Sequence, residues 1–242
     1  MRALKRFVYR NWQEFHGVRR MELGVLRSYL EPGAGNRILD VGSGKGAFAG
    51  KLSRAGHDVV GADPSVAAVR IAKAYVDFEG KFVLGEGERL PFSSERFDRA
   101  VSVCVLEHTK DDAAVLEEVR RVLKPGGVFA LTVDSLDSPY VPEAFRRDYA
   151  KEYRCNQFYS DAKLSRLLSE AGFEVLQTEY LFSGRLSVAI LRFGHRFHFR
   201  SAFVLLFPVL YPLLLLDRAV GGKKSSGMIL AAKARKPASL PS

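Results

Sequence analysis

Two periods of apolar and polar positions alternate along the chain and predict strands and helices in turn. Short apolar runs of strand length lie at residues 38–41, 57–63, 81–86, 97–105, 128–133, 173–181 and 227–234. Helical spacing of apolar residues predicts helices at residues 46–55, 66–75, 113–123 and 161–171, with Ser160 as a cap and Gly172 as a stop for the last one. Residues 1–30 also read as helical.

This alternation predicts an α/β fold, a Rossmann-like, doubly wound sheet of seven strands. Between the last two strands the usual helix pattern is missing, so we expect the last strand to be antiparallel. A hydrophobic insertion, residues 183–226, occupies that interval. We therefore expect an N-terminal basic helix or lid (1–30), a main domain (31–182 with 227–236) and the insertion.

The stretch "ILDVGSGKGAF", residues 38–48, has the composition of a nucleotide-binding loop. A P-loop needs a glycine where Leu39 stands and a serine or threonine where Gly46 follows Lys45, so this motif is excluded. A dinucleotide loop has the spacing G-x-G-x-x-G, which this stretch lacks. Asp40 would also repel a pyrophosphate at the strand end.

S-adenosylmethionine fits the same stretch because it has no phosphate. Its ammonium can be attracted by Asp40, and its carboxylate can meet the N–H groups where the helix begins near Gly46. Gly42 and Gly44 let the backbone approach the ligand. Asp63 ends the second strand, where a carboxylate can accept hydrogen bonds from both ribose hydroxyls.

Four blocks in order resemble the class I S-adenosylmethionine-dependent methyltransferases, in particular their small-molecule "type 11" branch. The blocks are "ILDVGSGKGAFAGKL", "VVGADPS", "GEGERLPFSSERFDRAVSVCVLEH" and "EVRRVLKPGGVFALTV". The resemblance implies that Pro64 and Cys104 lie at the cofactor, that Glu86 contacts the adenine amine and that the Gly87 backbone lies beside the ring. The family's usual "GDAE" is "GEGE" here, which puts a longer acid at Glu86.

Transfer of the methyl group from the sulfonium of S-adenosylmethionine to an acceptor depends mostly on positioning and on exclusion of water. His108 follows the fourth strand at the ligand-binding edge and is our candidate for a base or acceptor-orienting group; the alternative is that it braces the loop. No metal site is expected from the two cysteines, Cys104 and Cys155. Residues 134–159 are rich in Tyr, Phe and Arg and are expected to form a lid over the acceptor, or else a solvent-facing connection.

Charge separates the ends of the chain from its middle. The net charge is +10, and residues 185–242 hold ten lysines and arginines against one acid, Asp217. Residues 186–199 have the spacing of a basic amphipathic helix, and residues 202–216 form an apolar run with Pro208 and Pro212 inside. This run is too short and kinked to span a membrane. Three interpretations of this segment stay open: attachment to an anionic membrane surface, a core or dimer-interface hairpin, and a re-entrant segment. The apolar run argues against nucleic acid as the partner.

The sequence thus predicts a methyltransferase that uses S-adenosyl-L-methionine on a small, apolar or lipid-linked acceptor. We expect a cytoplasmic protein attached to the inner face of the membrane. The alternatives are a soluble sugar or natural-product methyltransferase whose insertion makes a homodimer, and a non-catalytic S-adenosylmethionine-binding scaffold.

Overall fold

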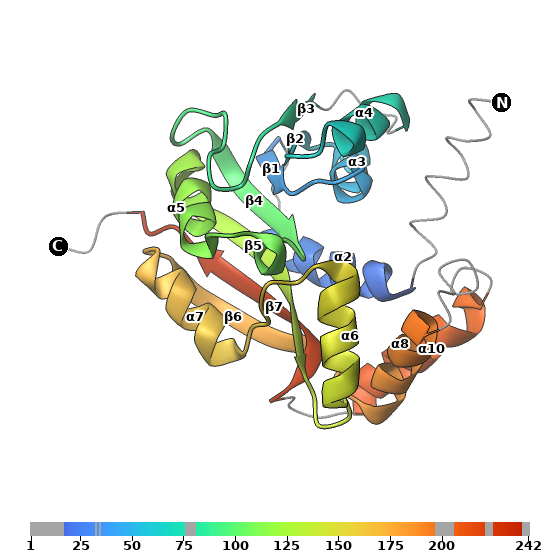
Figure 1. Cartoon of the computed structure of the whole chain (residues 1–242). Coiled ribbons are helices and arrows are strands. Elements are labelled where there is room, and N and C mark those ends of the chain that lie inside the picture. Colours follow the sequence, from blue (N-terminus) through green and yellow to red (C-terminus); the bar gives the residue numbers. More distant parts are fainter. Residues whose placement is uncertain are drawn as a thin grey trace.

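A mixed sheet of seven strands forms the centre of the computed structural model (Figure 1). The structure describes residues 17–31, 33, 35–75, 81–196, 206–220 and 225–238. The strand order is β3-β2-β1-β4-β5-β7-β6. Their bounds are β1 (Arg37–Val41), β2 (Asp58–Asp63), β3 (Lys81–Leu84), β4 (Phe97–Val103), β5 (Leu123–Asp137), β6 (Glu174–Leu181) and β7 (Gly227–Arg235).

The direction of the strands confirms the predicted fold class. Strands β1 to β5 pair in parallel, and β7 lies antiparallel between β5 and β6. β1 and β4 are neighbours, but the chain leaves β1 toward β2 on one side and β4 toward β5 on the other. Ligands of doubly wound sheets bind beyond the carboxyl ends of the strands at such a switch point.

Helices cover both faces of the sheet, and alternate residues of a strand therefore enter two different apolar layers. Ile38 packs with one buried cluster and Leu39 with the other. The helices are α2 (Gly17–Leu30), α3 (Ala47–Arg54), α4 (Val66–Tyr75), α5 (Asp112–Val122), α6 (Glu143–Tyr153), α7 (Asp161–Glu170), α8 (Arg185–Arg196) and α10 (Phe207–Val220). A short 3₁₀ turn, η1 (Leu106–His108), follows β4.

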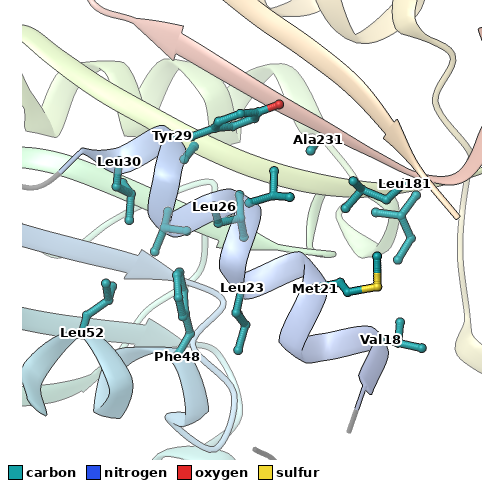
Figure 2. Close-up of a cluster of buried hydrophobic side chains, with 14 of the residues drawn as sticks. Val18, Met21, Leu23, Leu26, Tyr29, Leu30, Phe48, Leu52, Leu181 and Ala231 are labelled. Atoms are coloured by element: carbon teal, nitrogen blue, oxygen red, sulfur yellow. The ribbon is translucent and has the colours of Figure 1, made fainter. Parts of the chain in front are cut away.

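The N-terminal part of the described chain belongs to the core. Figure 2 shows α2 crossing the sheet, with Leu23 and Leu26 near Phe48 of α3, and Met21 on the side of Leu181. Helices α5 and α7 pack on the opposite face. Residues 1–16 of the predicted N-terminal helix lie outside the described residues.

Two segments differ from the sequence predictions. β5 begins at Leu123, five residues before the predicted strand, and continues to Asp137. Residues 134–159 contain a helix, α6, which the apolar periodicity did not predict because it buries no residue fully.

The insertion folds in part as two helices that pack on each other and, through α10, on α2 (Figure 1). α8 realises the predicted amphipathic helix, and residues 197–199 of that prediction lie outside the described residues. α10 includes Pro212, and its buried side chain Leu214 joins the core. In the described part of the chain, each helix is too short or too polar to cross a membrane.

Candidate functional site

A pocket of about 590 Å³ opens beyond the carboxyl ends of β1, β4 and β5. Asp40 near the end of β1 and Gly42 just after it line the pocket, as do Cys104 and His108 after β4. Other predicted site residues lie around the neighbouring loops, outside its lining. These are Gly44, Gly46, Asp63, Pro64, Glu86 and Gly87.

The glycine loop is held close to β4 in a conformation that favours glycine. Gly42 has a φ of 68°, and a Cβ at this position would lie 2.4 Å from Val105 Cγ2. The N–H groups of Gly42 and Ser43 both donate to the carbonyl of Ala62, at 2.8 and 3.0 Å. Glycine is required here because both the backbone angle and the available space exclude a side chain.

Asp40 is buried at the base of the loop. Its Oδ2 accepts a hydrogen bond of 3.2 Å from the N–H of Ala49 in the first turn of α3. Burial raises the pKa of Asp40 to about 7, the Ala49 hydrogen bond opposes this shift and the charge of Asp63 adds to it. A cationic group in the pocket would favour the ionised carboxylate, which is what binding of an ammonium requires.

Asp63 connects the end of β2 to the glycine loop. Its Oδ2 accepts from the N–H of Gly44 at 2.7 Å, and its Oδ1 accepts from the N–H of Ser65 at 2.9 Å. The next loop lies close by, since the N–H of Gly85 donates to the carbonyl of Asp63 at 3.2 Å. Glu86 in that loop is exposed and pairs with Arg89 in an isolated bridge. The predicted ribose and adenine residues are therefore neighbours, and their roles stay predictions.

A network of buried polar groups begins at Cys104. This residue has a φ of 52°, and its thiol donates to Glu22 Oε1 of α2 at 3.2 Å. Thr132 donates to the same oxygen at 3.0 Å, and Arg19 donates to the other carboxylate oxygen at 2.8 Å. Burial raises the pKa of the Cys104 thiol well above its ordinary value, with a further contribution from Glu22, so the thiol stays protonated.

Two more acids, Glu107 and Asp134, are buried beside this network. Glu107 Oε1 accepts from the N–H of Asp134 at 3.0 Å, while Glu107 Oε2 has no hydrogen-bond partner among the described residues. Burial raises the pKa of both carboxyls. The negative charge of Asp134 adds to the shift of Glu107, and the charge of Glu22 adds to the shift of Asp134. Ligand atoms of Cys104, Glu107 and Asp134 lie within 4.8 Å of one another, so among the described residues this group could hold a metal ion.

Aromatic and imidazole side chains line the pocket on the side of α6 and α8. Phe145, Tyr149 and Tyr153 come from α6, and His195 comes from α8. The insertion and the predicted lid thus both contribute to the pocket.

His108, the predicted base, is exposed at the pocket edge. Its Nδ1 lies 3.4 Å from the carbonyl oxygen of Arg154. This position is compatible with either of its predicted roles, a base or a brace of the loop, and the role of His108 stays a prediction.

Sequence reasoning missed several pocket residues. Glu22, Asp134, Tyr149 and His195 had not been singled out. Asp134 follows the apolar run 128–133 at the same sheet edge as Cys104, which is a signal that could have identified it. The spacing of Phe145, Tyr149 and Tyr153, four residues apart, is helical and was also available.

Comparison with known proteins gives one matching family and many relatives. The type 11 family described as "Methyltransferase domain" matches residues 39–131. A ubiquinone biosynthesis O-methyltransferase of Azorhizobium caulinodans is 28% identical over 66% of this chain and 72% of its own. A demethylmenaquinone methyltransferase of Corynebacterium kroppenstedtii is 35% identical over 48% of each chain.

Solved structures agree on the fold. A Haemonchus contortus phosphoethanolamine N-methyltransferase, in complex with S-adenosyl-L-methionine, superposes with a TM-score of 0.68 at 20% identity. The alignment covers 90% of this chain and 52% of that one. At this identity the likeness concerns the fold.

Proposed function

We propose that the chain is a class I S-adenosylmethionine-dependent methyltransferase and that it methylates a small, apolar or lipid-linked acceptor at a membrane surface. S-adenosyl-L-methionine is its cofactor and supplies an activated methyl group. The acceptor and the membrane surface are the new parts of this proposal.

Residues around the glycine loop have the chemistry to hold this cofactor. Asp40 offers a carboxylate to the ammonium, and the N–H groups at the start of α3 offer donors to the carboxylate. Asp63 offers acceptors to the ribose, and Glu86 and Gly87 lie in the next loop, where the adenine is expected. Buried Asp40 would be ionised by this contact although burial raises its pKa to about 7.

The acceptor side of the pocket suits a flat aromatic ring. Phe145, Tyr149 and Tyr153 of α6 line this side and pack on one another. Two relatives of this chain are named as a ubiquinone biosynthesis O-methyltransferase and a demethylmenaquinone methyltransferase. A quinol-type ring is therefore the acceptor class that we propose.

The observation that carries the membrane proposal is the double role of α8. Leu191 and His195 of this helix line the pocket, whereas Leu186 and Phe193 are exposed on its surface. A lipid-linked acceptor would need such an arrangement, because its ring must enter the pocket while its tail stays in the lipid.

The exposed surface of α10 extends this apolar area. Val209, Leu215 and Leu216 are 59%, 43% and 57% exposed, and Pro208 and Pro212 are exposed as well. All of these side chains lie on one side of the helix, opposite the buried Leu214. Clusters of exposed apolar side chains indicate an interaction surface.

Positive charge around the insertion favours anionic lipid as the partner of this surface. Residues 183–226 hold seven lysines and arginines against one acid, Asp217, and Arg185 is exposed at the start of α8. Each basic residue near an anionic leaflet contributes about 1 kcal/mol to attachment. A dimer formed through α10 would bury the same leucines but would gain nothing from this charge.

A screen with radiolabelled methyl donor tests the acceptor class. The full chain is incubated with the donor and with a membrane lipid extract or a pool of water-soluble metabolites. We expect label in the organic phase. Label confined to the water-soluble fraction would instead support a sugar or natural-product acceptor, with the insertion forming a dimer that light scattering would detect.

A further inference from the structure

His195 lies in the last turn of α8, and one of its ring nitrogens is buried without a hydrogen-bond partner among the described residues. The side chain lines the pocket and is 12% exposed. Its Nδ1 is buried and has no hydrogen-bond partner among the described residues. A buried polar atom without a hydrogen-bond partner destabilises the folded protein. Its presence in a residue of the pocket wall therefore indicates a ligand group that forms the missing hydrogen bond.

The other ring nitrogen of His195 faces a carboxylate. Nε2 lies 3.4 Å from Oε2 of Glu152 on α6. In neutral imidazole one nitrogen carries the proton and the other accepts, and a neighbouring carboxylate favours the proton on the nitrogen that it faces. Glu152 thereby leaves the lone pair on Nδ1 free to accept a proton.

Three aromatic rings hold the imidazole in place. Phe145 meets it edge-on at a centroid distance of 5.0 Å, and Tyr149 and Tyr153 lie at 5.6 and 5.7 Å. All three rings come from α6, and their packing restricts the rotation of the histidine before a ligand arrives. Preorganisation of this kind is what a proton acceptor in catalysis needs.

Other basic groups of the pocket are less suited to accept a proton. The thiol of Cys104 donates to Glu22 Oε1, and Glu107 is not part of the pocket lining. Asp134 already accepts a hydrogen bond from the Cys155 thiol at 3.6 Å. His108 is exposed, and its Nδ1 faces the carbonyl of Arg154.

We propose that Glu152 and His195 form a base dyad that takes the proton from an acceptor hydroxyl, which makes this enzyme an O-methyltransferase of phenol-type rings. The proposal rests on the methyltransferase function above and specifies its acceptor atom. The acceptor oxygen forms a bond to the methyl carbon while the bond from sulfur to that carbon breaks and its electron pair stays on sulfur. The hydroxyl proton moves to His195 Nδ1, and the products are a methyl ether, neutral S-adenosylhomocysteine and imidazolium.

A base is needed for a phenol but not for an amine. A neutral amine attacks through its own lone pair, whereas a phenol with a pKa near 10 is a weak nucleophile until its proton is removed. General base catalysis contributes about 10²–10⁴-fold to such a step. His195 is the catalytic residue of this dyad, and Glu152 is a positioning residue that acts through it.

The first test examines the Glu152–His195 pair in the absence of a methyl acceptor. Nitrogen-15 NMR of histidine in the full chain reports which ring nitrogen carries the proton, and His195→Gln assigns the resonance. We expect His195 to be protonated at Nε2 and bare at Nδ1, and Glu152→Gln to reduce this preference. A proton on Nδ1 in the wild-type protein would overturn the dyad.

The second test measures methyl transfer to hexylcatechol and to nitrocatechol, whose hydroxyl ionises more easily. With hexylcatechol we expect His195→Gln to lower kcat by about 10²–10⁴-fold, and Glu152→Gln to lower it less, with S-adenosylmethionine affinity unchanged by calorimetry. With nitrocatechol, the decrease in kcat caused by each of these variants should be smaller. Equal losses on both catechols, or no loss, would overturn the role as base.

A matched histidine variant controls for general damage. His57→Gln changes a half-buried histidine just before β2, outside the pocket lining, and should leave kcat unchanged. If the wild-type enzyme methylates neither catechol, the proposed acceptor class fails. The NMR result still decides whether the dyad exists.

Discussion

The carboxylate of Asp63 accepts a hydrogen bond of 2.7 Å from the backbone N–H of Gly44. This contact joins the end of β2 to the glycine loop after β1. The predicted ribose-binding residue therefore also shapes the loop that is expected to hold the rest of the cofactor. Any change at Asp63 should affect both.

Asp63→Asn is expected to weaken S-adenosylmethionine binding about tenfold or more, equivalent to about 1.4 kcal/mol. An amide keeps the size of the side chain but replaces one acceptor oxygen with a donor, which faces either Gly44 or the ribose. Calorimetry measures the dissociation constant. Asp58→Asn at the exposed start of the same strand is the matched control and should change it little. Equal effects of both variants would contradict the assignment.

Gly42→Ala is expected to cost more stability than Gly56→Ala. Both glycines have positive φ, 68° and 89°, so both variants carry backbone strain of roughly 1–2 kcal/mol. Only at residue 42 would the new methyl group also collide with Val105, whereas nothing lies within 4 Å at residue 56. Denaturant unfolding measures the difference, which overpacking puts at roughly 1–3 kcal/mol. Equal losses would show that the close approach of Val105 is unimportant.

The buried Asp40 should make the stability of the ligand-free protein depend on pH. Its pKa is raised from 3.8 to about 7 in the folded state, so between these values the folded protein keeps a proton that the unfolded chain has lost. Stability from this group is therefore present at low pH and falls as pH rises toward 7, by at most about 1.4 kcal/mol per pH unit.

Asp40→Asn isolates this effect, since an amide does not titrate. The free energy of unfolding of the variant minus that of the wild type should therefore increase from pH 4 to pH 7. Denaturant unfolding at several pH values measures the difference. A difference that stays constant across this range would contradict the raised pKa.

The outward face of α10 should determine attachment to vesicles. Leu215→Gln with Leu216→Gln removes two exposed leucines and should reduce flotation with anionic vesicles several-fold, without changing the melting temperature. Leu84→Gln with Leu176→Gln is the matched control, because these leucines are 54% and 38% exposed on other elements. Equal flotation of both double variants would place the attachment site elsewhere.

The sequence located those parts of the fold that are buried on both sides. The apolar run at residues 38–41 predicts β1 because this central strand is covered by helices from both faces. Helix α4 has the predicted bounds, Val66–Tyr75. Helix α6 was missed although Phe145, Tyr149 and Tyr153 have helical spacing, because it is half-buried and lacks a fully buried apolar face.

The acceptor side of the site could not be predicted from local patterns. His195 follows Gly194 in a stretch whose arginines suggested lipid headgroups, and only the packing of α8 on α6 brings its ring among the aromatic side chains. Glu22 joins the Cys104 network across 82 residues of chain. Contacts of this length depend on tertiary structure, which the motif order around the cofactor loop does not contain.

The central claim is that a lipid-linked ring enters the pocket from a membrane surface beside α8 and α10. The direct measurement is the rate of methyl transfer from S-adenosylmethionine to a long-chain alkyl catechol, embedded in anionic or in neutral vesicles. We predict faster transfer on anionic vesicles, and a loss of this advantage in the Leu215→Gln, Leu216→Gln variant while transfer to hexylcatechol in solution is kept. Equal rates on both vesicle types, unaffected by the variant, would contradict the claim.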